Sequence, residues 1–314
     1  MANLKELSAL PERLAGGHRL CGGCGASICV RQVLMGAGDA DVVCSSATGC
    51  LEVSTTVYPY SSWKTPFIHN AFANSAATMS GVEAAYNGLK RAGKIPADKE
   101  IKFCAFGGDG GTYDIGLQSL SGAMERGHNM VYVCYDNGAY MNTGIQRSSA
   151  TPHGAWATTS EVGSVQQGKQ QRRKDLTSIM AAHHIPYVAQ ASISNWRDLV
   201  NKAEKAFNTD GPAFIDVMAP CPRGWRIKSD ETVEIARLAV ETGFWPLFEI
   251  DHGVWKMTPV RGERKPLTEF LKPQGRFKHL FKPGNEQLLE QLQQECDEFY
   301  AYVERMCSLY AEKK

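Results

Sequence analysis

The sequence predicts an α/β fold in which a doubly wound, mostly parallel sheet carries helices on both faces. Two nearly continuous apolar segments, at 101–106 and 129–137, flank an amphipathic segment at 114–127, as in a β-α-β unit. Helix and strand patterns alternate again between 178 and 221. Strands that are apolar along their whole length are typical of parallel sheets buried on both faces.

The N-terminal half supplies the first elements of this sheet. A short helix is expected at 28–36, directly after a Cys-x-x-Cys turn, because its pattern ends at a glycine. A strand is expected at 40–46, and an alanine-rich, closely packed helix at 71–92. The β-α-β unit then follows, with a loop of four glycines around one aspartate at 107–111.

The second half continues the alternation and then loses it. We expect a helix followed by a strand at 178–192, an amphipathic helix at 195–208 and a strand at 211–221. After about residue 228 a basic, Pro- and Gly-rich stretch shows no sheet pattern.

A long final helix begins near Asn285, with an apolar stripe at steps of three or four residues. We therefore divide the chain into an α/β domain at 1–228 and an irregular arm with a long helix at 229–314. Such a tail suits contact with another subunit, and the alternative is a helix folded back on its own domain.

Charge and hydropathy exclude several classes of protein. Lys and Arg number 34 against 33 Asp and Glu, a net charge of +1, so neither nucleic acid nor an anionic membrane is an expected partner. No apolar span approaches the roughly 20 residues of a transmembrane helix, and the first residues lack the apolar run of a signal peptide. We expect a cytoplasmic protein.

The ten cysteines fall into distinct groups. Four lie in apolar strand or helix patterns and are expected to be ordinary core residues: Cys104, Cys134, Cys296 and Cys307. Four others are embedded in Gly or Pro: Cys21, Cys24, Cys50 and Cys221. The Cys-x-x-Cys pair among them suits a zinc ion, a redox disulfide or half of an iron–sulfur cluster, and the pair alone leaves all three open.

The glycine-rich loop has the features of a phosphate site. Glycines let backbone N–H groups approach a phosphate at the start of a helix. Asp109 in this loop would repel a bare phosphate, unless a divalent cation bridges the two. Asn137 lies 28 positions later, at the end of the next strand, and is the expected second oxygen ligand. The arrangement resembles the magnesium–diphosphate motif of thiamine diphosphate enzymes.

Segments along nearly the whole chain extend this resemblance. They are GHRLCGGCGAS, ATGCLEV, YPYSSWKTPFIHNAF, GDGGTYDIGLQSLSGAMERGH, YDNGAYMNTGIQRSSATPHGA, GPAFIDVMAPCPRGW and ARLAVETGFWPLFE. Together they resemble the β subunit of the 2-oxoacid:ferredoxin oxidoreductases, and more narrowly its pyruvate and oxalate branch. The resemblance implies the thiamine-diphosphate-binding fold, ferredoxin as electron acceptor, and partner subunits, one of which supplies the glutamate that activates the cofactor.

The resemblance also implies which residues hold the cofactors. The 4Fe–4S cluster would be held by Cys21, Cys24, Cys50 and Cys221. Magnesium would be held by Asp109, Asn137 and the backbone carbonyl of Ala139. The thiamine cofactor would also contact Gly49, Gly108, Gly110, Gly111, Met141, Asn142 and Thr143, of which Asn142 would have a catalytic role.

The spacing of the four cysteines is compatible with this set. The 25 residues between Cys24 and Cys50 and the 170 between Cys50 and Cys221 match neither a ferredoxin nor a compact zinc ribbon. Cys44 is the rival third ligand. We prefer Cys50 because it lies in a Gly-containing turn, whereas Cys44 ends an apolar strand.

Two further residues are candidates for substrate contact. Arg31 follows the Cys-x-x-Cys turn by about two helical turns, and as a catalytic residue it would clamp a substrate carboxylate. The alternative is a surface cation on an amphipathic helix. His69 would donate to substrate or cofactor, or would be a hydrogen-bonded core residue.

The implied reaction is oxidative decarboxylation of a small 2-oxoacid, with electrons leaving singly through the 4Fe–4S cluster. Gly138 and His153 depart from the glutamate and the aromatic residue that are usual in the pyruvate branch. A smaller residue and an added polar donor suit a dianion, so both oxalate and pyruvate are candidate substrates. The alternatives are a non-oxidative thiamine diphosphate decarboxylase or synthase with a structural zinc site, and an electron-transfer subunit that keeps the loop as scaffold.

Overall fold

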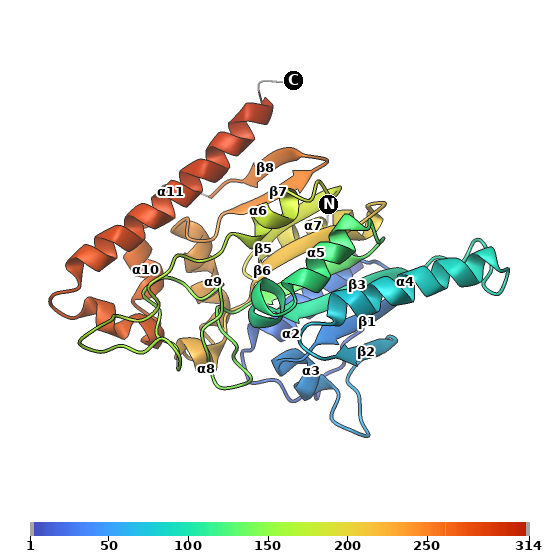
Figure 1. Cartoon of the computed structure of the whole chain (residues 1–314), viewed down its shortest axis with the longest axis horizontal. Helices are drawn as coiled ribbons and strands as arrows, with labels where there is room; N and C mark the ends of the chain where they lie inside the picture. Colours follow the sequence, from blue (N-terminus) through green and yellow to red (C-terminus); the bar gives the residue numbers. More distant parts are fainter. Residues whose placement is uncertain (1–2, 261, 312–314) are drawn as a thin grey trace.

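The computed structural model describes residues 3–260 and 262–311. Within these residues one sheet has eight strands in the order β2-β1-β3-β4-β6-β5-β7-β8. The strands are β1 (Val42–Ala47), β2 (Phe67–Asn70), β3 (Lys102–Gly108), β4 (Val131–Asp136), β5 (Tyr187–Ser192), β6 (Ala213–Met218), β7 (Leu247–Asp251) and β8 (Val254–Thr258). All pairs from β2 to β5 are parallel, and β7 and β8 add antiparallel at one edge (Figure 1). The predicted α/β class with a mostly parallel sheet is confirmed.

Helices cover both faces of the sheet, as predicted. One face carries α2 (Gly25–Met35), α7 (Trp196–Asn208) and α9 (Thr232–Glu241), and the other carries α4 (Ser75–Arg91), α5 (Leu117–Glu125) and α6 (Leu176–Ala181). Alternate residues of β4 enter the two cores, because successive side chains of a strand point to opposite faces. Val133 and Tyr135 join the core under α2, whereas Tyr132 and Cys134 join the core under α5.

The remaining helices of the described chain are short, apart from the last. They are α1 (Leu4–Ala9), α3 (Cys50–Thr55), the π-helical η1 (Gly110–Asp114), α8 (Pro222–Trp225), α10 (Leu267–Leu271), the 3-10 helix η2 (Gly275–Phe281) and α11 (Glu286–Ala311). None of the helices in residues 3–260 and 262–311 is both long and apolar enough to cross a membrane.

The sheet continues beyond residue 228, which the sequence pattern did not predict. β7 and β8 form a hairpin of two five-residue strands, joined at His252 and Gly253, which both have positive φ. Strands this short carry too few alternations to stand out among polar residues. α11 packs against β8, α10 and η2, and so lies on its own domain (Figure 1). The sheet therefore extends past residue 228.

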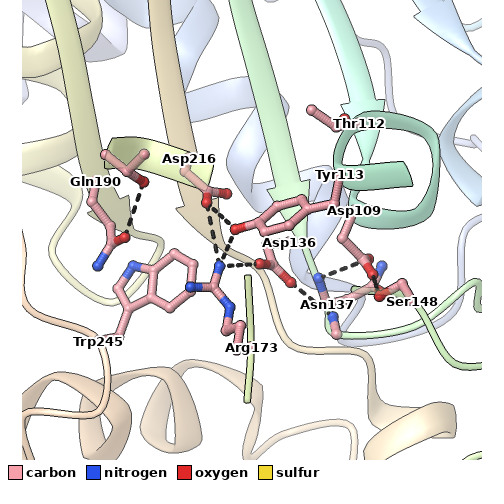
Figure 2. Close-up of polar contacts among 12 residues, drawn as sticks. Asp109, Thr112, Tyr113, Asp136, Asn137, Ser148, Arg173, Gln190, Asp216 and Trp245 are labelled. Carbon is pink, nitrogen blue, oxygen red and sulfur yellow. Dashed lines mark hydrogen bonds and ion pairs between the residues drawn. The ribbon is translucent and has the colours of Figure 1, made fainter. Parts of the chain in front are cut away.

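A buried ionic network attaches the long loop before α6 to the sheet (Figure 2). Arg173 of this loop donates to Asp136 at the end of β4 at 2.5 Å, and to Asp216 of β6 at 3.3 Å. It also donates to the Tyr113 hydroxyl and stacks over Trp245, with 4.3 Å between the guanidinium carbon and the ring centroid. Burial lowers the pKa of Arg173, but Tyr113, Asp136 and Asp216 outweigh it, so the net shift is upward.

Replacing Arg173 should therefore destabilise the fold strongly. Arg173→Met keeps most of the side-chain volume but leaves two carboxylates buried without their cation, and we expect a loss of about 3–5 kcal/mol in the free energy of unfolding. The matched control is Arg172→Met, whose side chain is 61% exposed beside Glu298 and should cost less than about 1 kcal/mol. Urea unfolding of the two variants measures the difference, and equal losses would contradict the assigned role.

Candidate active site at the carboxyl edge of the sheet

The carboxyl ends of β1, β3 and β4 open onto one cavity. Parallel strands end at the same edge, and α/β sheets bind ligands at this edge. The ten positions expected to bind the thiamine cofactor all line the cavity: Gly49, Gly108, Asp109, Gly110, Gly111, Asn137, Ala139, Met141, Asn142 and Thr143. Cys50, one of the four expected cluster ligands, lines it as well.

The side-chain amide of Asn137 lies between two oxygen acceptors on one side of this cavity. One end of the amide is 3.0 Å from Asp109 Oδ1 and 2.9 Å from the carbonyl oxygen of Ala139. With its nitrogen at this end, the amide donates a hydrogen bond to both oxygens, and this orientation satisfies both acceptors. Asp109, Asn137 and Ala139 thus bring oxygen-bearing groups together, and oxygen is the ligand atom that hard cations prefer.

Asp109 itself is completely buried at the end of β3. The Ser148 hydroxyl donates to its Oδ2, and the Asn137 backbone N–H lies 3.4 Å from its Oδ1 (Figure 2). Burial, and then the neighbouring charge of Asp136, raise the pKa of Asp109 well above its usual range. A carboxylate in this position needs a positive charge beside it.

The four glycine- and proline-flanked cysteines come together next to the cavity. Cys24 caps α2, Cys50 opens α3 and Cys221 caps α8, so three of them lie at helix N-termini. The Gly25 N–H donates to the Pro220 carbonyl at 3.1 Å, which joins the first cysteine turn to the last. The Gly224 N–H donates to Cys221 Sγ at 3.4 Å.

These cysteines are close enough to act on one another electrostatically. Burial raises the pKa of Cys24 to about 11 and that of Cys50 to about 12, and Cys21 and Cys221 add to both shifts. Cys21 likewise raises the pKa of Cys221, where burial is again the main cause. Across the described ranges, no three His, Cys, Asp or Glu side chains lie close enough to share a single metal ion.

The rival ligand Cys44 lies elsewhere. It is completely buried within β1, paired in register with Cys104 of β3. Three of the four expected core cysteines, Cys104, Cys134 and Cys296, are buried, which confirms their assignment, while Cys307 is half-buried.

Arg31 and His69 do not line the cavity. Arg31 pairs with Glu12 at 3.1 Å and donates to the Leu14 carbonyl, which favours the helix-surface cation of the alternative interpretation. His69 is 71% exposed, with Nδ1 3.0 Å from Glu52 Oε1. It is therefore not a core residue either.

The two positions that suggested oxalate do not line the cavity either. A Cβ atom at Gly138 would lie 2.8 Å from Arg276 Nη1. His153 contacts Glu295 of α11 at 3.0 Å. It lines a separate cavity of about 330 Å³ under α11, which contains no predicted site residue. Their effect on substrate charge is therefore not supported.

Three residues of the site carry no recognisable sequence signal. Ser148 donates to Asp109 from a loop 39 residues further along the chain. Tyr140 packs its ring against Gly110, and Tyr135 lies between Gly108 and Gly49. The register of the strands and the path of the loop place these residues there. Neither can be read from the residues next to them in the sequence.

Comparisons with known proteins agree with this geometry. Residues 47–217 match the family model described as the thiamine pyrophosphate enzyme, C-terminal TPP binding domain. The pyruvate synthase subunit PorB of Thermotoga maritima is 53% identical over 302 residues, covering 94% of this chain and 93% of that protein. The PorB subunit of Methanocaldococcus jannaschii is also 53% identical, covering 91% and 95%.

More distant relatives extend the same picture. The ketoisovalerate oxidoreductase subunit VorB of Pyrococcus horikoshii is 46% identical over 88% of this chain and 89% of its own. A solved structure of 2-oxoglutarate:ferredoxin oxidoreductase from Magnetococcus marinus superposes with a TM-score of 0.54 at 20% identity, covering 72% of this chain and 79% of that chain, which supports the fold alone. The chain belongs to the thiamine-diphosphate-dependent 2-oxoacid:ferredoxin oxidoreductases, as their β subunit.

Proposed function

We propose that this chain is the thiamine-diphosphate-binding subunit of a pyruvate:ferredoxin oxidoreductase, in which it also carries a 4Fe–4S cluster. The observation that carries the proposal is the meeting of two ligand sets at one cavity. Cys50, one of the four expected cluster ligands, and Asp109, one of the three expected magnesium ligands (the oxygen group), both line this cavity. Pyruvate is favoured over oxalate because the relatives that match over nine-tenths of the chain are pyruvate synthase subunits. Neither Gly138 nor His153 lines the cavity.

The oxygen group fits magnesium. Asp109, the Asn137 side chain turned so that its oxygen faces the ion, and the Ala139 carbonyl would supply three oxygen ligands, and Mg²⁺ commonly completes its coordination with phosphate oxygens. Gly110 and Gly111 line the same cavity, where their backbone N–H groups can approach a diphosphate. When bound, thiamine diphosphate supplies the electron sink for decarboxylation. The role of the chain is to hold this cofactor and to exclude water around it.

The cysteine group suits an iron–sulfur cluster. A 4Fe–4S cluster takes four cysteine thiolates, and the four cysteines lie close enough to act on one another electrostatically. Their spacing along the chain does not match a compact zinc ribbon. The Gly224 N–H, which donates to Cys221 Sγ at 3.4 Å, would stabilise the thiolate form of this ligand.

Met141 and Gly224 place the two groups side by side. Met141 lines the cofactor cavity, and its sulfur occupies the space where a Cβ atom of Gly224 would lie, next to Cys221 Sγ. The thiamine site and the cluster are thus separated by little more than one side chain in the proposal. This short separation suits transfer of single electrons, first to the cluster and then onward to ferredoxin.

The chain needs a partner to be active. Asp109 is the sole carboxylate among the described residues that line the cavity, and it is used for the cation. The glutamate that activates the cofactor should therefore come from another subunit. Exposed apolar side chains near α3, Val53, Tyr58 and Tyr60, are candidates for that contact, and α11 with the arm before it offers a second. We place the complex in the cytoplasm, where its cysteines stay reduced.

The substrate test uses the purified complex with ferredoxin and coenzyme A. Pyruvate should be oxidised with a kcat/KM at least about 10-fold above that of 2-oxoisovalerate, since a small pocket rejects extra methyl groups to this extent. Oxalate should release no carbon dioxide above background. Turnover of oxalate in preference to pyruvate would overturn the substrate assignment.

The cluster assignment predicts a difference between two cysteines only six positions apart. Cys50→Ser should lower the iron and sulfide content of the anaerobically purified complex by about four atoms of each per chain, whereas Cys44→Ala should leave both unchanged. Iron and sulfide analysis checks this. Zinc instead of iron in the wild-type chain would favour the non-oxidative alternative.

The magnesium assignment is tested independently of the cluster. Asp109→Asn removes the charged ligand and should weaken binding of thiamine diphosphate in the presence of Mg²⁺ by at least about 10–100-fold, with an unchanged iron content. Isothermal titration measures the affinity. Asp114→Asn is the control, because Asp114 bonds Ser149 and does not line the cavity. Equal losses in both variants would contradict a specific role for Asp109.

A further inference from the structure

Tyr135 crosses the site between the cysteine group and the cofactor cavity. It is paired in register with Gly108 of β3, and its ring lies 3.3–3.4 Å from the place where a Cβ atom of Gly108 would be. Its hydroxyl lies 2.8 Å from the corresponding position at Gly49. The two glycines therefore leave a channel that the phenol fills, and the side chain lines the cavity.

The Tyr135 hydroxyl has no hydrogen-bond partner among the described residues. The side chain is 2% exposed, and the oxygen is fully covered by protein atoms. Tyrosine hydroxyls that are buried usually have a partner. Tyr132, three positions earlier on the opposite face of β4, follows this rule, because its hydroxyl pairs with Thr112 at 3.1 Å.

The unpaired hydroxyl lies near the cysteine group. Gly49, whose Cβ position lies 2.8 Å from this hydroxyl, directly precedes Cys50 at the start of α3. Cys50 and Cys24 act on Tyr135 electrostatically, and both do so more strongly than Asp109. A group bound between the four cysteines would therefore lie closer to the Tyr135 hydroxyl than a diphosphate bound beside Asp109 would.

We propose that the Tyr135 hydroxyl donates a hydrogen bond to a sulfur atom of the cluster held by the four cysteines, and so makes that cluster easier to reduce. The inference rests on the proposed cluster. Reduction adds one negative charge to the cluster, and a hydrogen bond to sulfur stabilises that charge. Tyr135 is thus a tuning residue that acts through the cluster, at the point where electrons leave the thiamine site.

The experiment compares wild-type complex with Tyr135→Phe, and with Tyr132→Phe as a matched control from the same strand. The cluster is identified by the electron paramagnetic resonance signal that Cys50→Ser lacks. A redox titration gives the reduction potential of the cluster. Pulsed electron paramagnetic resonance in D₂O detects an exchangeable deuteron near the cluster. Iron, sulfide and thiamine diphosphate content are measured in each sample.

We expect Tyr135→Phe to keep its iron, sulfide and thiamine diphosphate, to shift the cluster to a more negative potential and to lose the deuteron signal. Tyr132→Phe should match the wild type. An unchanged potential in Tyr135→Phe, or the same shift in both variants, would overturn the inference while leaving the proposed cluster intact. Weaker cofactor binding with an unchanged potential would also overturn it, by assigning the hydroxyl to the diphosphate. Absence of iron from the wild-type chain would overturn the proposed function and this inference together.

Discussion

The buried carboxylate of Asp109 is the constraint around which the site is arranged. It has no exposed surface, and a serine hydroxyl and a backbone N–H bond to it, while no side chain among the described residues forms an ion pair with it. The Asn137 amide lies between this carboxylate and the Ala139 carbonyl, and its nitrogen can donate to both. Burial and the nearby charge of Asp136 still raise the pKa of Asp109, so a cation bound beside it would stabilise its ionised form.

Asp136, which directly precedes Asn137, stabilises the backbone of the site. One of its oxygens accepts the N–H of Gly138 at 2.8 Å, and the other accepts from Arg173. The first interaction holds the turn that presents Asn137 and Ala139, and the second ties that turn to Asp216 in the next strand. Two consecutive residues at the end of β4 therefore have different roles. Asp136 holds the backbone of the turn, and Asn137 lines the cavity.

The cysteine group depends on close backbone approach. Gly25 lies against Ala219 and Pro220, so any side chain at Gly25 would push the first cysteine turn away from the last. Cys50 follows β1 and lines the cavity. Cys221 follows β6, and because β1 and β6 belong to the parallel part of one sheet, their ends bring Cys50 and Cys221 to the same edge.

The sequence by itself determined the α/β alternation, the Asp109–Asn137 pair and the cysteines in glycine and proline contexts, because local periodicity and spacing along one β-α-β unit encode them. The β7–β8 hairpin was too short to leave such a pattern. Only the tertiary structure decided that Arg31, His69, Gly138 and His153 do not line the cavity, that Tyr135 does, and that Ser148 bonds Asp109. The physical reason is that a side chain's direction depends on strand register and on how distant loops pack, and neither is written in the residues next to it.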